Sequence, residues 1–156
     1  MITFSETVNI KADPARVWRA LTTPSEVVCW DTGVIEPLDA PDDYPAPGQH
    51  VRWRYRFGPI PLTLHDHPSE VETCSRLRSS IQLGPFDFDE IYTLTRWESS
   101  GTRLEAELSL SSPTPILGPL LERLVGQPLA RSTVRTSLGA IRSHCEESPG
   151  PPGEEP

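Results

Sequence analysis

A carboxylic acid and a phenol stand two positions apart in a segment of alternating apolar and polar residues. The even-numbered residues of this segment are Phe86, Phe88, Glu90, Tyr92 and Leu94. Side chains of one parity leave the same face of a β-strand, so Glu90 and Tyr92 are predicted to point together into an apolar interior. A carboxyl group in that position would have a raised pKa and could act as a general acid or base.

Other interpretations of these two residues stay open at this level. A β-bulge near Gly84 would shift the alternation and turn Glu90 outward, or Glu90 would pair with an arginine at the mouth of the interior. Tyr92 could hydrogen-bond a ligand through its hydroxyl or simply pack its ring in the core. Glu6 poses the same question as Glu90, because it shares the parity of the apolar residues in the strand predicted over 2–10.

Two histidines flank an aspartate in the sequence His65-Asp66-His67. Alternate residues of a strand share a face, so the two imidazoles are placed as two metal ligands would be. A third ligand is not evident, and residues next to Pro68 are typical of a solvated strand end, so no metal site is predicted. The sequence also contains no phosphate-loop, dinucleotide-binding or serine-nucleophile motif, and no cofactor is predicted.

The segments that must position Glu90 and Tyr92 have the pattern of successive antiparallel strands. The clearest is 50–57, where apolar and aromatic side chains alternate with His50 and three arginines. Further strands are predicted over 2–10, 34–36, 62–73 with an interruption near Pro68, 77–83, 86–94 and 104–110. Short turns that contain Gly, Pro or Ser join several of them, which predicts an antiparallel meander.

Two short helices are predicted after the first strand, and a long one near the end of the chain. Asp13 and Pro14 are residue types preferred at the N-cap and first position of a helix, and Thr23 and Pro24 begin a second. In the segment 116–147 the apolar residues recur at helical spacing, with one face formed by Val134, Leu138, Ile141 and Cys145. Pro128 predicts a kink in this segment, or a break into a short and a long helix.

One long helix cannot cover six or seven strands, because a helix is about 10 Å wide and strands lie about 4.8 Å apart. We therefore predict an α+β fold in which a curved six- to seven-stranded antiparallel sheet wraps around the C-terminal helix. Incomplete filling of that space would leave an apolar ligand cavity. The residues predicted to line it are Trp53, Tyr55, Phe57, Leu64, Ile81, Phe88, Glu90, Tyr92, Leu108 and Leu138.

Composition limits the possible partners. The chain of 156 residues has a formal net charge of −8, which argues against nucleic-acid binding. Its three widely spaced cysteines, the lack of a signal-peptide pattern and the lack of a run of ~20 apolar residues predict a cytoplasmic protein with no integral membrane segment. One domain is predicted over 1–147, with a disordered acidic tail over 148–156, as a monomer or a homodimer.

The order of predicted elements resembles the SRPBCC (START/Bet v 1-like) superfamily, in its bacterial polyketide cyclase/dehydrase and lipid-transport branch. The likeness is carried by the segment 8–21 (VNIKADPARVWRAL) with Trp30, and more weakly by 47–52 and 101–104. The resemblance implies the helix-grip fold and a cavity for a hydrophobic small molecule, such as a polyketide-like aromatic, an isoprenoid or a lipid. Relatives of this kind leave two alternatives open: a cyclase or dehydratase that uses Glu90 and Tyr92 to move protons, or a chaperone- or ribosome-associated module that binds a protein partner.

Overall fold

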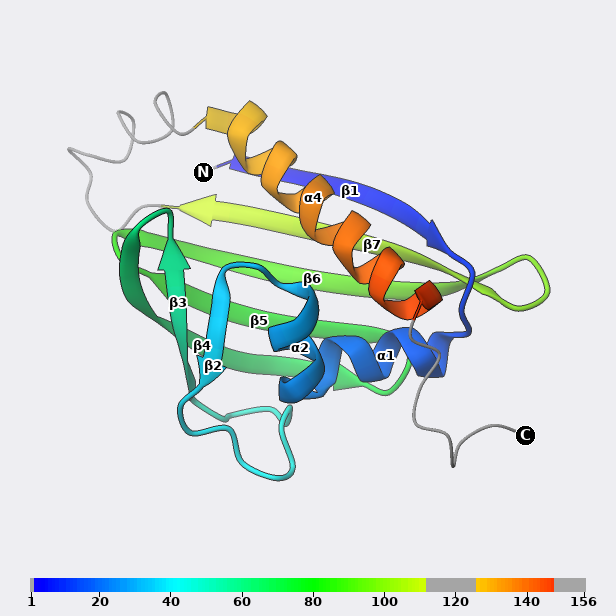
Figure 1. Ribbon diagram of the computed structural model, residues 1–156, viewed down its shortest axis with the longest axis horizontal. Coiled ribbons are helices and arrows are strands. Elements are labelled where there is room, and N and C mark those ends of the chain that lie inside the picture. The colour runs from blue at the N-terminus through cyan, green and yellow to red at the C-terminus, as the bar shows by residue number, and fades with distance from the viewer. Residues whose placement is uncertain (1, 112–125, 148–156) are drawn as a thin grey trace.

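The computed structural model describes residues 2–111 and 126–147, and these form one curved sheet with helices on one side of it (Figure 1). Strand β1 (Ile2–Ile10) is followed by helices α1 (Pro14–Thr22) and α2 (Pro24–Trp30). The remaining strands are β2 (Val34–Pro37), β3 (Val51–Phe57), β4 (Ile60–Glu72), β5 (Arg76–Leu83), β6 (Phe86–Trp97) and β7 (Gly101–Ser111). Helix α4 (Gly126–Glu147) follows them.

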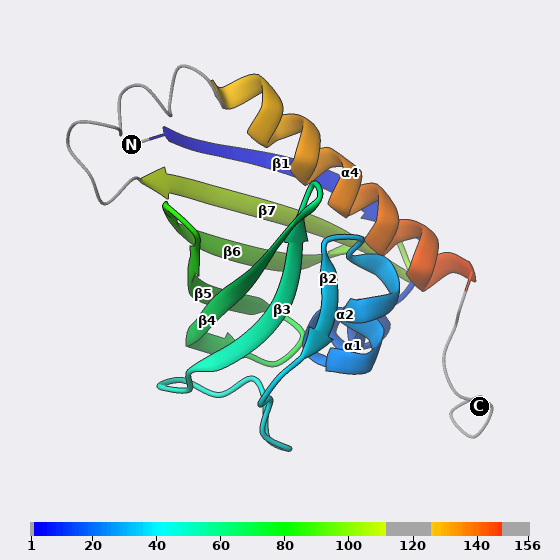
Figure 2. The ribbon, with the colours of Figure 1, turned by 60° about the vertical axis from the view of Figure 1, so that its left-hand side comes forward.

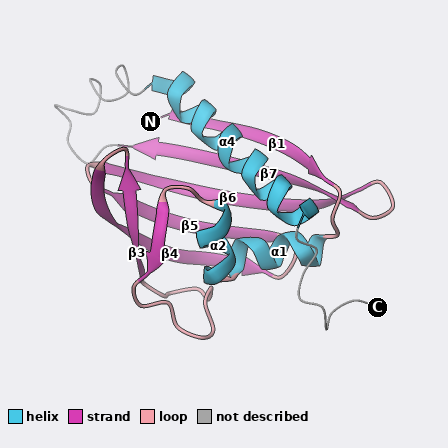
Figure 3. Ribbon diagram, viewed as in Figure 1, coloured by secondary structure: helices cyan, strands magenta, loops and turns pink. Residues whose placement is uncertain are grey.

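The seven strands form a single antiparallel sheet in the order β1-β7-β6-β5-β4-β3-β2. From β2 to β7 each strand pairs with the next one along the chain, and β1 pairs with β7. Figure 2 shows the sheet curling around the side that carries the helices, and Figure 3 shows that α1, α2 and α4 all lie on that side. The predicted meander and the long helix across it are therefore present.

Pro68 does not interrupt β4, although the sequence analysis placed an interruption there. Instead, the pairing of β4 with β5 shifts register between Pro68 and Glu70. A proline has no N–H to donate to a neighbouring strand, and a bulge lets the strand continue past it. The bulge changes the parity that faces the core, from Leu64 and Asp66 before it to Val71 after it.

The helix starts follow the sequence signals. The Asp13 carboxylate accepts a hydrogen bond from the backbone N–H of Arg16 at 2.9 Å, and Pro14 occupies the first turn of α1. Helix α4 begins at Gly126, which places Pro128 in its first turn, where a backbone N–H has no intrahelical partner to lose. The predicted break at Pro128 and the predicted tail concern segments that lie partly or wholly outside the described residues.

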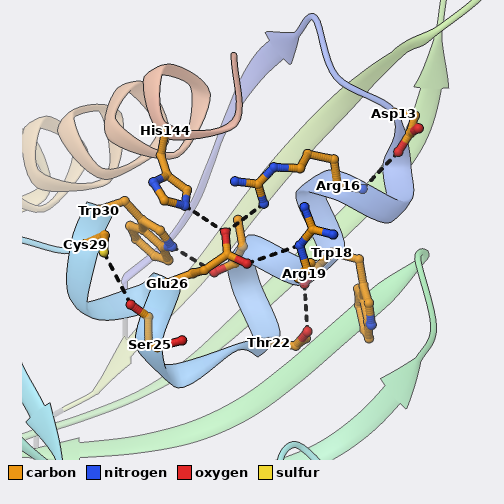
Figure 4. Close-up of polar contacts among 11 residues, drawn as sticks. Asp13, Arg16, Trp18, Arg19, Thr22, Ser25, Glu26, Cys29, Trp30 and His144 are labelled. Carbon is orange, nitrogen blue, oxygen red and sulfur yellow. Dashed lines mark hydrogen bonds and ion pairs between the residues drawn. The ribbon is translucent and has the colours of Figure 1, made fainter. Parts of the chain in front are cut away.

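A polar cluster joins the three helices at one end of the sheet (Figure 4). Glu26 of α2 forms ion pairs with Arg16 at 2.7 Å and with Arg19 at 3.2 Å, and it forms a hydrogen bond with His144 of α4 at 2.8 Å. Burial opposes ionisation of Glu26, but hydrogen bonds from His144 and Arg16 outweigh it, and the pKa of Glu26 lies below its ordinary value. The C-terminal half of α4 is thereby fixed to α1 and α2.

The packed core lies at the same end. Ile141 and Cys145 of α4 are buried in one cluster with Ile10, Val17 and Leu104. Within the described residues, no helix is both long and apolar enough to cross a membrane. The other half of α4 faces a space that side chains do not fill, and this space is the candidate site.

Candidate functional site

A cavity of about 180 Å³ lies between the concave face of the sheet, the end of α2 and the first half of α4. Its lining comes from almost every element: Leu21 and Trp30 from the short helices, strand residues from β2 to β7, and Val134 and Leu138 from α4. Most of these side chains are aliphatic or aromatic, because the concave face collects one parity of every strand. This geometry gives an apolar chamber with a small number of polar groups, the usual character of a small-molecule site.

Nine of the ten residues predicted from the sequence border this cavity. They are Trp53, Tyr55, Leu64, Ile81, Phe88, Glu90, Tyr92, Leu108 and Leu138. Strand alternation was sufficient to place the eight strand residues, because the pairing of β3 through β7 has no register shift at these positions, and helical spacing placed Leu138. The predicted bulge near Gly84 that would have turned Glu90 outward is absent from the β5–β6 pairing.

Phe57 is the exception, and its predicted place in the lining needs correction. It pairs with Ile60 at the tip of the β3–β4 hairpin, and 47% of its surface is exposed. Alternation assigned Phe57 to the face of Tyr55, but at the hairpin tip Phe57 borders a second, more open pocket, which Ser132 and Thr136 of α4 also line. Parity predicts the face of a strand and not where along the strand the cavity ends.

Glu90 and Tyr92 point into the cavity side by side. Tyr92 is buried, with 8% of its surface exposed, and its hydroxyl forms a hydrogen bond with Glu90. Burial and then the negative charges of Asp66 and Asp31 raise the pKa of Glu90 to about 8, against a smaller opposing effect of the Tyr92 hydrogen bond. A carboxyl group with this pKa exchanges its proton readily near neutral pH.

Asp66 brings a second carboxyl group into the lining. It is 5% exposed, and its Oδ2 accepts hydrogen bonds from the Tyr44 hydroxyl at 2.7 Å and the Trp53 indole N–H at 3.3 Å. Its Oδ1 is buried and has no hydrogen-bond partner in the structure. Burial raises the pKa of Asp66, although these donors and the Ser79 hydroxyl oppose the shift.

Asp31 is the third carboxyl group of the lining and follows α2 directly. Its Oδ1 accepts a hydrogen bond from the Gly33 N–H at 3.0 Å, yet burial prevails and raises its pKa. Burial and the charges of Asp31 and Glu90 raise the pKa of the neighbouring Tyr55 to about 12. The Tyr55 ring packs directly against Gly33, so closely that a Cβ at Gly33 would overlap it.

Sequence reasoning missed Asp31, Asp66 and Tyr44. For Asp66 a signal was present, because it has the parity of Leu62 and Leu64 in the same strand. The prediction considered instead the flanking histidines, which lie on the opposite face, as possible metal ligands. Asp31 and Tyr44 lie in connecting segments without periodicity, so no pattern in the sequence indicates where they point.

The remaining polar residues singled out by the sequence lie outside the cavity lining. Glu6 faces α4 and pairs with Arg131 at 3.0 Å and Arg135 at 3.1 Å. Hydrogen bonds from these two arginines lower the pKa of Glu6, so the arginine-paired interpretation applies to this residue.

The two histidines that flank Asp66 lie on the opposite face of β4, where His50 joins them. Nε2 of His50 is 2.8 Å from Nδ1 of His65, and the His50 ring stacks on that of His67 with centroids 4.4 Å apart. No three His, Cys, Asp or Glu side chains in the described parts of the chain are arranged to hold a metal ion. The cavity, and not this histidine cluster, is the candidate site.

Comparison with known proteins agrees with this geometry. A family model described as polyketide cyclase/dehydrase and lipid transport matches residues 1–146. The chain belongs to this family. No curated protein matches the sequence.

Several solved structures share the fold of this family member. A START superfamily protein from Mycobacterium smegmatis superposes with a TM-score of 0.73 at 14% identity, over 93% of this chain and 97% of the other. A protein from Mesorhizobium loti gives a TM-score of 0.72 at 18% identity, over 94% of this chain and 98% of the other. A protein from Thermus thermophilus gives a TM-score of 0.65 at 20% identity, over 92% of this chain and 96% of the other. The fold is therefore the START-like helix grip that the sequence resembles.

Proposed function

We propose that this protein binds a small hydrophobic molecule, such as a polyketide-like aromatic, an isoprenoid or a lipid, in the cavity between the sheet and α4. The observation that carries the proposal is the mainly apolar cavity of about 180 Å³, with polar groups confined to a few positions. Membership in a family described by polyketide cyclisation and lipid transport supports it. The three free cysteines support action in the cytoplasm, and either a monomer or a homodimer is compatible with this site.

A matched pair of tryptophan variants tests the location of binding. Leu108 lies in the cavity opposite Glu90 in the β6–β7 pairing, and Ile91, the next residue of β6, lies on the other face of the sheet. Leu108→Trp should fill the chamber and weaken binding of 1-naphthalenemethanol, a neutral apolar probe, by at least about tenfold. Ile91→Trp should leave the affinity within about threefold of that of the unchanged protein.

The comparison is made by isothermal titration calorimetry, after circular dichroism has shown that both variants are folded. Failure of the unchanged protein to bind the probe would overturn the proposal. So would equal affinity for the two variants, because binding would then occur away from the cavity. Native mass spectrometry of the protein from its own cells would identify any small molecule that copurifies.

A second candidate function is catalysis of proton transfer, as in a polyketide cyclase or dehydratase. It is favoured by the hydrogen-bonded pair of Glu90 and Tyr92 in one cavity and by a Glu90 pKa of about 8. A protonated Glu90 could donate to a departing hydroxyl, and an ionised one could remove a proton next to a ketone, while Tyr92 hydrogen-bonds the carbonyl oxygen.

Glu90→Gln tests this second candidate, because it keeps the size of the side chain and removes its proton exchange. Cyclisation or dehydration of a poly-β-ketone analogue should slow by about 10²- to 10⁴-fold, while affinity for that analogue changes little. Unchanged turnover in the variant would exclude Glu90 as the acid or base.

The third alternative, a module that binds a protein partner, requires an exposed apolar patch. Among the described residues, the exposed large hydrophobic side chains are Leu38, Phe57 and Ile60. Phe57 and Ile60 adjoin at the β3–β4 hairpin tip, but two side chains make a small fraction of a stable interface. The described surface therefore favours the two functions that use the cavity.

A further inference from the structure

The described lining of the cavity contains acidic side chains and no basic ones. It contains the carboxyl groups of Asp31, Asp66 and Glu90, and it contains no Lys, Arg or His side chain. The charges of Asp31 and Asp66 both act on Glu90, so the three groups share one electrostatic environment. Negative charge in an apolar chamber is unfavourable unless a positive group or hydrogen-bond donors balance it.

One carboxylate oxygen of Asp66 also has no hydrogen-bond donor among the described residues. The hydrogen bonds from Tyr44 and Trp53 both go to Oδ2. The Ser79 hydroxyl lies close enough to lower the pKa of Asp66, but no group in the described parts of the chain is placed to form a hydrogen bond with Oδ1. The residue is 5% exposed, and Oδ1 itself is buried. A buried acceptor of this kind favours a ligand that supplies an N–H or O–H.

Aromatic rings surround these carboxyl groups. Tyr44 and Trp53 meet edge to face with centroids 5.7 Å apart at an angle of 71°, and Tyr55 and Tyr92 also belong to the lining. The face of an aromatic ring attracts a cation, and the attraction grows where water is excluded. Carboxylates among aromatic faces are thus a chemical match for an ammonium group.

We propose that the ligand of this cavity carries a protonated amine on an apolar body, and that the amine donates a hydrogen bond to Oδ1 of Asp66. The proposal rests on the proposed binding function and specifies the ligand's charge. A hydroxyl group would also donate to Oδ1, but it would leave the negative charge of the lining unbalanced. A carboxylate or phosphate would add to that charge, so fatty acids and other anionic lipids are disfavoured.

Three probes that share one bicyclic body test this proposal. They are 1-naphthylmethylamine, 1-naphthalenemethanol and 1-naphthoate, titrated calorimetrically into the full chain near neutral pH and moderate salt. The amine should bind at least about tenfold more tightly than the alcohol, because it offers both a donor and a positive charge. Naphthoate should bind at least about tenfold more weakly than the alcohol.

Asp66→Asn is the variant that tests the assigned contact. It should reduce the preference for the amine over the alcohol to within about threefold, while affinity for the alcohol changes by less than about threefold. Asp89→Asn is the matched control, because Asp89 adjoins Glu90 in β6 but bonds Arg78 and Ser80 on the opposite face. That control should keep the full preference, which separates the cavity from nonspecific attraction to an acidic surface.

The outcomes separate the two proposals. If the alcohol binds but the amine has no advantage, or if naphthoate binds most tightly, the amine proposal is wrong and the binding function stands. If none of the three probes binds, both are wrong. Should Asp66→Asn fail to fold, Asp66→Ser replaces it, because it also removes the carboxylate, and retention of the full amine preference in the folded variant would overturn the proposal.

Discussion

At Glu90, burial and two neighbouring carboxylates act in the same direction, and together they favour the protonated acid. The pKa of about 8 is well above the ordinary value of 4.5. In an unfolded chain this carboxyl group would ionise freely in water. The folded protein therefore binds a proton at Glu90 that the unfolded chain releases, and its stability must depend on pH.

The first prediction is that stability falls as pH rises through the interval between these two pKa values. Below about pH 4 Glu90 is protonated in both states and contributes no pH dependence, whereas above it the folded state alone retains the proton. From about pH 5 to about pH 9 the loss due to this residue should be on the order of 4 kcal/mol. Glu90→Gln, which cannot ionise, should lack this component when free energies of unfolding are measured in urea at several pH values.

Because other carboxyl groups of the lining also titrate, the informative quantity is the difference between the variant and the unchanged protein. Within this window, the free energy of unfolding of Glu90→Gln should increase relative to that of the unchanged protein as the pH rises. Asp89→Asn, on the other face of the same strand, serves as the control and should show no such trend. Parallel pH profiles for Glu90→Gln and the unchanged protein would mean that Glu90 is ionised in the fold.

A second residue-scale prediction concerns the contact of Gly33 with Tyr55. Gly33→Ala places a methyl group where the Tyr55 ring now lies, so the ring must move within the cavity. We expect a loss of roughly 1–3 kcal/mol of stability and weaker binding of a neutral naphthalene probe. Gly139→Ala in α4 is the control, because no other atom lies near its Cβ, and it should stabilise the helix by roughly 0.5–1 kcal/mol. Equal melting temperatures for the two variants would contradict this account.

At the scale of the elements, most of the sheet could be predicted from the sequence. Every strand that forms a cavity wall has one apolar and one polar face, and this period of two is what half-burial in a sheet produces. The starts of α1 and α2 were equally clear, because Asp13-Pro14 and Thr23-Pro24 are residue types with a physical role at helix starts. Features that depend on neighbouring residues alone, such as strand alternation and helix starts, can therefore be recognised in the sequence.

The places of Tyr44 and Asp31 in the cavity lining could not be predicted in the same way. Tyr44 reaches Asp66 from a proline-rich connection, and Asp31 enters after the last turn of α2. Their positions depend on how separate elements pack, which no short segment of sequence encodes. The prediction for Phe57 was wrong for a related reason, since the place where the cavity ends along a strand is a tertiary property.

A prediction about the helices follows from the cluster around Glu26. Glu26→Ala removes the shared partner of Arg16, Arg19 and His144 at a position where the Glu26 side chain is 20% exposed. We expect a loss of roughly 2 kcal/mol in urea unfolding, less than for a fully buried ion pair. Glu36→Ala is the control, because Glu36 and Arg54 are 3.9 Å apart and both more than half exposed, and it should cost less than about 0.5 kcal/mol. Similar losses in both variants would argue against the role of the cluster.

For the molecule as a whole, α4 connects a packed end to a hollow end. Its later residues Ile141 and Cys145 are buried in the core, and His144 is tied to α2. Its earlier residues Val134 and Leu138 border the cavity, although Leu138 also belongs to the buried core cluster. The ion pairs of Arg131 and Arg135 with Glu6 hold that half to β1, but Arg135 is 66% exposed, so water and salt weaken its pair.

This asymmetry predicts a gradient of hydrogen exchange along α4. In the free protein, amides of residues 131–138 should exchange faster than those of 139–144, because local opening is easier beside an unfilled space. Saturation with a bound probe should narrow the difference, since opening of the cavity half would then require release of the probe. Leu108→Trp fills the cavity with a side chain, so it should reduce the difference in exchange rate between the two halves of α4 without any probe. Ile91→Trp should leave that difference unchanged. Uniform exchange along α4 in the free protein would show that the cavity does not loosen the helix above it.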